Sequence, residues 1–136
     1  MDYLFRGFHE CEDGKQIAVV DGKEHKGEWI DGYFFKIWHE YYILWGTTNG
    51  IPNMLEVLPE TVGLWTGLTD KNGKMIFAND KIYSHRAKNK YTVIWEDCAF
   101  EISDEYGNRI LQKQESVMRM DCEVIGTVFE NNGGEQ

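Results

Sequence analysis

The chain has 136 residues, of which 42% are hydrophobic and 14% aromatic, so it can form one domain, or two very small ones that share a core. Its formal net charge is −9 and both halves are acidic, which excludes a basic half dedicated to nucleic acid. No apolar run approaches the about 20 residues of a membrane span, and the N-terminus lacks the pattern of a signal peptide, so we expect a cytoplasmic protein without membrane contact.

The first half of the chain predicts short antiparallel strands joined by turns. The dipeptides Asp21–Gly22 and Asp31–Gly32 are typical of hairpin turns. Residues Thr47–Asn53 contain the turn-forming residues Asn49, Gly50 and Pro52, so we expect a loop there. Apolar and alternating residues predict strands at Tyr3–Phe8, Gln16–Val20, Glu28–Ile30, Tyr33–Trp38, Tyr41–Trp45 and Met54–Leu58.

The stretch Leu55–Ser84 has the densest turn signals of the chain. Pro59 has no amide hydrogen and favours an extended residue before it, so the preceding strand ends there. In the turn Asp70–Gly73, the aspartate side chain can accept from nearby amides and glycine tolerates positive φ. A second turn is expected at Asn79–Asp80, again with a residue that tolerates positive φ. The structural turn residues are Asp70, Asn72, Gly73, Asn79 and Asp80.

The second half continues the same pattern. Helical composition is confined to the short segment Gln112–Met120, and the polar tail Asn131–Gln136 is expected to fray. Strands are predicted at Lys74–Ala78, Lys81–His85, Tyr91–Trp95, Phe100–Ser103, Arg109–Gln112 and Cys122–Phe129.

Together these segments predict a β-rich fold, all-β to α+β, within a single domain over residues 1–136. We expect an N-terminal antiparallel sheet over residues 1–67, packed against a C-terminal SH3-like small barrel over residues 68–130.

The segment EVLPETVGLWTGLTDKNGKMIF, which begins at Glu56, resembles the signature of the YopX family of small phage and prophage proteins. The segments Lys26–Tyr33 and Glu123–Asn131 are similar to two further pieces of that family, in the same order. The chain departs from the family pattern at Leu64–Trp65, where the family has Gln-Tyr, and at Asn79, where it has glycine. The resemblance implies a fold and a setting in the cytoplasm of a host cell, but no reaction and no cofactor.

The histidines and cysteines give little sign of a metal site. His9 and Cys11 form the one close pair, whereas structural zinc sites combine two tight ligand pairs. A buried or half-exposed cysteine beside a surface histidine is the favoured alternative, so we expect no metal. Cys11, Cys98 and Cys122 are widely spaced, and we expect all of them to be reduced.

A catalytic site is also weakly supported. Glu96 and Asp97 follow Trp95, and a carboxylic acid beside an aromatic wall can act as a general acid. A turn after a strand is the favoured alternative, and no motif of nucleophilic catalysis is present. We therefore expect no enzymatic activity, with a hydrolase that uses Glu96 or Asp97 left as an alternative.

The clearest basic cluster consists of Lys81, His85, Arg86, Lys88 and Lys90. Tyr83 and Tyr91 flank it, and aromatic residues interleaved with cations are typical of single-strand binding. Lysines in a hairpin also serve solubility and block pairing between sheet edges. A nucleic-acid-binding module is therefore the alternative function, disfavoured by the net charge.

Large aromatic residues crowd into the region Trp29–Trp45, more than one side of a short sheet can bury. A remaining apolar face is a candidate interface. We expect a non-enzymatic interaction module whose partner is a second copy, in a homo-oligomer, or another protein. The candidate interface residues are Trp29, Tyr33, Phe35, Trp38, Tyr42 and Trp45.

Overall fold

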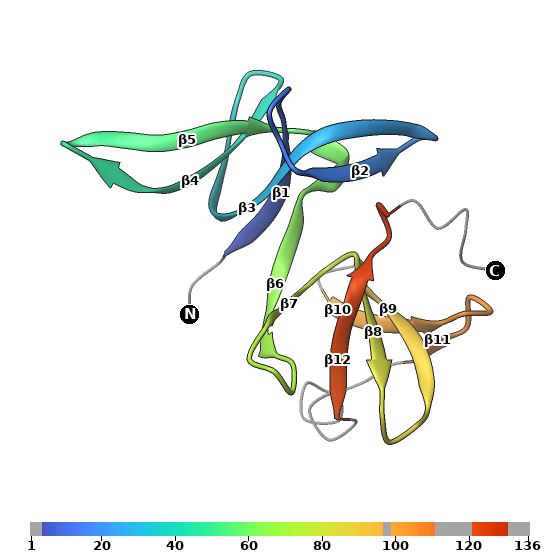
Figure 1. The fold of residues 1–136 in the computed structure, drawn as a ribbon. Coiled ribbons are helices and arrows are strands. Elements are labelled where there is room, and N and C mark those ends of the chain that lie inside the picture. The colour runs from blue at the N-terminus through green and yellow to red at the C-terminus, as the bar shows by residue number, and fades with distance from the viewer. Residues whose placement is uncertain (1–3, 97–98, 111–120, 131–136) are drawn as a thin grey trace. The chain divides into compact units, whose positions relative to one another are not determined.

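The computed structural model describes residues 4–96, 99–110 and 121–130. Backbone contacts divide the chain into two compact units, residues 1–64 with 129–136 and residues 65–128. The strands form two sheets in which neighbouring strands are antiparallel. The prediction of a β-rich chain is therefore confirmed (Figure 1).

The first unit is organised around β3 (Lys23–Ile37), a strand of 15 residues. Its first part pairs with β2, its middle with β1 and its last part with β4. The sheet has the order β5-β4-β3-β1-β6-β7, with β2 paired to β3. The other elements of this unit are β1 (Phe5–Glu10), β2 (Gln16–Val20), β4 (Glu40–Thr48), β5 (Ile51–Val57) and the 3₁₀ helix η1 (Pro59–Thr61). The last two strands in the order are β6 (Gly63–Thr69) and β7 (Met75–Phe77); most of β6 and all of β7 belong to the second unit.

The turn predicted at Asp31–Gly32 is wrong, because β3 runs through both residues. Gly32 lies opposite Phe5 of β1, and a Cβ atom there would collide with the carbonyl oxygen of Leu44. Glycine is needed at this position for close approach of two backbones, rather than for a turn.

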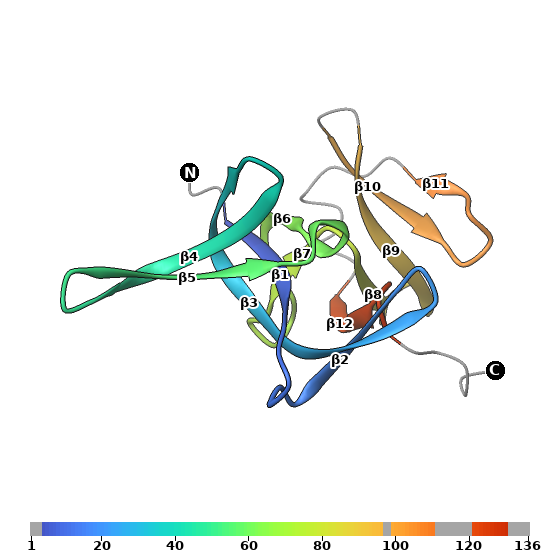
Figure 2. The same ribbon diagram turned by 90° about the horizontal axis from the view of Figure 1, so that it is seen from above.

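Of the loop predicted at Thr47–Asn53, only Asn49 and Gly50 form a turn. The flanking residues belong to β4 and β5, which form a hairpin extending past the rest of the first unit (Figure 2). Asn49 and Gly50 have φ angles of 54° and 79°, as the favoured two-residue hairpin turn requires. Pro52 is tolerated because β5 is the edge strand of its sheet.

The core of the first unit is small and centred on Phe8 and Ile43, both fully buried. The ring of Trp29 packs against Phe8 with its centroid 5.1 Å away. The chain after β5 is tied to β1, because Leu58 N donates to Phe8 O and Phe8 N donates to Thr61 Oγ1, both at 2.9 Å. Residues far apart in sequence therefore hold β1 in place.

The second unit holds a five-stranded sheet of order β11-β10-β9-β8-β12. Its strands are β8 (Asp80–Ser84), β9 (Asn89–Glu96), β10 (Ala99–Asp104), β11 (Arg109–Ile110) and β12 (Cys122–Thr127). One apolar cluster fills its core, formed by Ile76, Ile82, Tyr91, Val93, Ile102 and Cys122.

Neither sheet closes on itself within the described residues, so the SH3-like barrel stays a prediction. The helical segment expected at Gln112–Met120 and the tail Asn131–Gln136 lie outside the described residues.

Candidate interaction surface

One face of the β3–β4–β5 ladder is apolar and open. Its residues share a face because they lie opposite one another in the register and alternate along each strand. The opposite face carries Ile43 and Val57, both buried. We call the open side the outer face; it consists of Tyr33, Phe35, Ile37, Tyr42, Leu44 and Met54, with Glu40 and Glu56 beside them.

The centre of the outer face is ordered by a ring stack. Phe35 and Tyr42 lie opposite each other, with centroids 5.3 Å apart and planes at 12°. Around this pair, the exposed fractions are 51% for Tyr33, 44% for Ile37 and 41% for Met54. A contiguous group of half-exposed apolar side chains is typical of an interaction site.

The charge on the outer face is acidic. Partial burial raises the pKa of the Tyr42 hydroxyl, and the nearby carboxylates of Glu40 and Glu56 raise it further. Lys36 lies on the opposite side of the ladder, with its Nζ 5.3 Å from the ring centroid of Tyr41. The outer face as defined above therefore contains carboxylates and no basic side chain.

The structure brings together three of the predicted interface residues, Tyr33, Phe35 and Tyr42. Trp38 lies in the turn between β3 and β4, and Trp45 lies at the bulge that follows Leu44. Both side chains are exposed.

Trp29 does not join the outer face. It lies in the part of β3 that pairs with β1, and its ring packs against Phe8 and Phe129. The guanidinium carbon of Arg6 lies over this ring, 4.9 Å from its centroid. Ile37, Leu44 and Met54 also lie on the outer face but were not among the predicted interface residues; strand alternation with the correct register indicates them.

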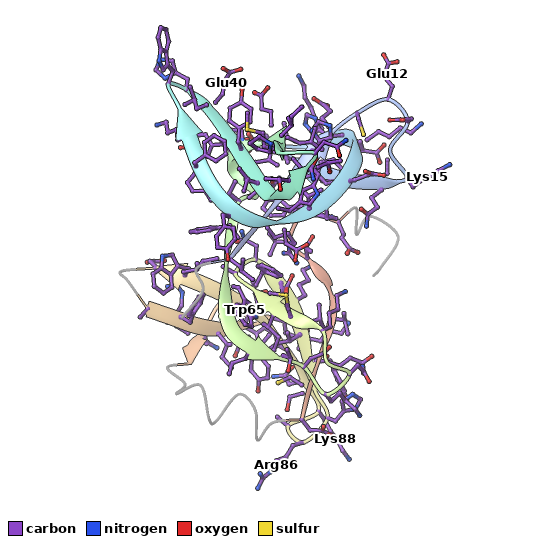
Figure 3. All side chains as sticks on the ribbon, turned by 90° about the vertical axis from the view of Figure 1, so that its left-hand side faces the viewer. Glu12, Lys15, Glu40, Trp65, Arg86 and Lys88 are labelled. Carbon is purple, nitrogen blue, oxygen red and sulfur yellow. The ribbon has the colours of Figure 1, made fainter. Side chains whose placement is uncertain are left out.

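The basic cluster is divided between the β8–β9 turn and the strands beside it. Figure 3 shows Arg86 and Lys88 projecting from the end of this hairpin. Lys90 lies opposite Tyr83, on the side of the sheet that also carries Lys81. The stacking role expected for Tyr91 is wrong, because that ring is buried in the core of the second unit.

Acidic side chains lie beside this cluster. His85 Nε2 is 3.0 Å from the Glu123 carboxylate, and Lys71 Nζ is 3.9 Å from Asp121. These neighbours weaken the positive potential that a phosphate backbone requires.

The turn residues predicted around Asp70 have a structural role. The buried Asp70 carboxylate accepts hydrogen bonds from the amides of Asn72, Lys74 and Val124 at 2.8 to 2.9 Å. Burial alone would raise the pKa of this carboxyl, but the hydrogen bonds from these amides outweigh it and hold the pKa below its usual value. Gly73 has φ of 82°, the left-handed region expected there.

The second predicted turn is hydrogen-bonded to β9 and to the residue that follows β12. Asn79 has φ of 78°, its amide donates to Val93 O at 2.8 Å and its carbonyl accepts from Val128 N at 2.9 Å. The buried Asp80 carboxylate accepts from Phe77 N at 2.8 Å.

The candidate catalytic and metal residues do not converge. Glu96 is exposed and pairs with Arg109 at 3.0 Å, and Asp97 lies outside the described residues. His9 Nδ1 is 2.8 Å from the backbone oxygen of Glu56. Over residues 4–96, 99–110 and 121–130, no three histidine, cysteine or carboxylate side chains could together hold a metal ion.

The cysteine thiols are poorly placed for chemistry. Cys122 borders a cavity of about 180 Å³ that also contacts Asp70 and Asp121. Burial, with those two carboxylates, raises its pKa to about 11, so the thiol is protonated at neutral pH. Cys11 is a half-buried thiol whose pKa burial also raises, and Cys98 lies outside the described residues.

The fold and this surface define a small β-rich protein with an exposed apolar sheet face. In the part of the chain that is described, no helix is long and apolar enough to cross a bilayer. Residues 45–133 match the model of the YopX protein family, which covers more than half of the chain. The chain belongs to the YopX family. No curated protein matches it.

Proposed function

We propose that this protein is a non-enzymatic interaction module that associates with a second copy of itself through the outer face. The supporting observation is the continuous group of half-exposed apolar side chains centred on the Phe35–Tyr42 stack. Burying a large apolar side chain contributes about 1.5–3 kcal/mol, so covering several of them favours association. A second copy is always present at matching concentration.

Association by the face is favoured over association by the sheet edge. Thr48 and Ile51 flank the two-residue turn, so they form a hydrogen-bonded pair. Hydrogen-bonded and non-hydrogen-bonded pairs alternate, so the backbone groups of the next pair, Thr47 and Pro52, point away from each other. Pro52 therefore removes a donor from the free edge of β5. The edge is a poor template for another strand, whereas the outer face remains open.

The acidic residues of the outer face are compatible with a two-fold contact. Glu40 and Glu56 lie towards one end of the face, and the Leu44–Met54 pair lies towards the other. A two-fold axis that runs between the two outer faces, perpendicular to their strands, places opposite ends of the two faces against each other. Each carboxylate then faces the apolar end of the other copy instead of its own counterpart.

Association should be tested with a matched pair of charge substitutions. Ile37→Glu and Ile17→Glu change side chains of similar exposure, 44% and 45%, in the same unit. We expect light scattering to report a dimer for the wild type and for Ile17→Glu, and a monomer for Ile37→Glu. Circular dichroism must show that both variants are folded. A monomeric wild type at micromolar concentration, or equal effects of both variants, contradicts the proposal.

A second candidate function is nucleic-acid binding by the β8–β9 hairpin. The observation in its favour is that Arg86 and Lys88 are exposed at the hairpin end. If they bind phosphates, Arg86→Ser with Lys88→Ser abolishes salt-dependent retention of a single-stranded oligonucleotide. Wild-type protein that shows no retention at low salt eliminates this candidate.

The setting of the protein is part of the same proposal. The YopX resemblance supports a phage or prophage origin and action in the cytoplasm of the host cell. The SH3-like arrangement of the second unit likewise rests on the order of its strands and remains proposed.

A further inference from the structure

Three short hairpin turns lie between residues 4 and 64 of the first unit, and one of them differs from the others. The β2–β3 turn uses Asp21 and Gly22, with φ of 52° and 79°, and the β4–β5 turn uses Asn49 and Gly50, with φ of 54° and 79°. These are the residues that a turn with positive φ favours. The β3–β4 turn instead begins with Trp38, whose φ is 56°.

Trp38 is unfavourable for folding in two separate ways. A bulky side chain disfavours the left-handed region, where its Cβ approaches the backbone. Its side chain is also 86% exposed, so the burial of its apolar surface contributes almost nothing to the stability of the fold. An asparagine tolerates positive φ better than a tryptophan, as Asn49 does in the neighbouring hairpin. Backbone strain at an exposed aromatic residue points to a contact outside the chain.

We infer that Trp38 is the anchor of the self-contact and packs on the β4–β5 hairpin of the second copy. The inference rests on the function proposed above. Trp38 lies at one end of β4 and the β4–β5 turn lies at the other, so the two-fold contact described there brings these ends together. The receiving hairpin exposes Met54 at 41% on the outer face and Trp45 at 46% at the bulge beside it. Tryptophan is the residue most enriched among side chains that dominate interfaces.

The two roles of Trp38 predict opposite effects of a single substitution. Trp38→Asn removes strain and exposed apolar surface, so the midpoint of thermal unfolding, measured at a concentration where the chain is monomeric, should rise. The same change should weaken association by about tenfold or more, measured by sedimentation. If Trp38 served the fold alone, Trp38→Asn would lower the unfolding midpoint and leave the dissociation constant unchanged.

Asp21→Ala provides the control in the matching turn of the same unit. Asp21 also has positive φ, but it lies away from the outer face, in the turn between β2 and β3. We expect Asp21→Ala to lower the unfolding midpoint and to leave the dissociation constant unchanged. This control separates effects on the fold from effects on the contact.

The contact itself can be tested with Met54→Thr alone and together with Trp38→Asn. If the two residues meet across the interface, the loss of affinity in the double variant is smaller than the product of the two single losses. Independent losses, or an unchanged dissociation constant in Trp38→Asn, overturn the role of Trp38 and leave the outer-face dimer standing. A monomeric wild type overturns both.

Discussion

The second unit contains the same turn twice, at Asp70–Lys74 and at Asp104–Asn108. In each, the aspartate Oδ1 accepts from the amides two and four residues later, at 2.8 and 2.9 Å in the first turn and 2.9 and 2.9 Å in the second. The aspartate amide donates to the carbonyl four residues later, and a glycine amide donates back to the aspartate carbonyl. Gly73 and Gly107 have φ angles of 82° and 86°.

The two turns differ in the second carboxylate oxygen. Asp104 Oδ2 accepts from the side chain of Asn108, inside its own exposed turn, at 3.2 Å. Asp70 Oδ2 accepts from Val124 N at 2.9 Å, from a residue 54 positions away, and Asp70 is buried. One local sequence pattern therefore forms both turns, and only tertiary contacts make one of them a link between strands.

Asp70→Ala should have the largest effect. It leaves the amides of Asn72, Lys74 and Val124 without their buried acceptor, and a donor that loses its partner costs about 1–3 kcal/mol where water cannot replace it. We expect a loss of about 3–5 kcal/mol, or no stable fold, in urea unfolding followed by tryptophan fluorescence. A loss equal to that of Asp104→Ala would show that the bond to Val124 contributes nothing.

Gly73→Val and Gly107→Val should destabilise the protein by similar amounts, about 1–2 kcal/mol each. A Cβ at either glycine meets no atom within 4 Å, so the cost is local backbone strain alone. Urea midpoints of the two variants give the measurement. A much larger effect at Gly73 would mean that the burial of Asp70 also constrains the backbone of its turn.

The pH dependence of stability should separate Asp70 from a neutral replacement. The folded-state pKa of Asp70 lies below the ordinary value of 3.8, so its carboxylate contributes stability that is fully present above that value. This contribution is lost as the pH falls through the folded-state pKa. Asp70→Asn should therefore show a flatter decline in unfolding free energy below about pH 4 than the wild type. Parallel pH profiles for the two proteins would contradict the lowered folded-state pKa of Asp70.

Asp104→Ala should have the smallest effect. Hydrogen bonds, first that from the Asn108 amide, hold the pKa of Asp104 below its usual value, but water can replace the carboxylate at each exposed donor. We expect a slightly lower urea midpoint and an unchanged dissociation constant for self-association. An effect as large as that of Asp70→Ala would show that exposure does not distinguish the turns.

These turns also mark what could be predicted from the sequence. Asp70–Gly73 is formed by neighbouring residues, so its geometry could be inferred from residue types alone. Asp31–Gly32 carries a similar signal, yet its glycine serves the approach of Leu44, which local sequence does not reveal. The bond from Val124 to Asp70 could not be foreseen for the same reason.

The candidate interface was predictable to a similar extent. Alternation along one strand places Tyr33 and Phe35 on the same side, and the register adds Tyr42. Trp29 lies in the same strand, but its ring meets Phe129 from the end of the described chain. The bulge after Leu44 changes the alternation before Trp45, and bulges leave a weak sequence signal.

The proline on β5 has a consequence for how large an assembly can become. Strand addition at an open edge has no natural end point, because every added strand exposes a new edge and the product is a fibre. A contact between two equivalent faces is complete after one partner, since each face is then covered. With Pro52 disrupting the edge, growth by strand addition is disfavoured while pairing by the face is not. The position of Pro52 in the edge strand thus favours a finite particle over an open-ended polymer.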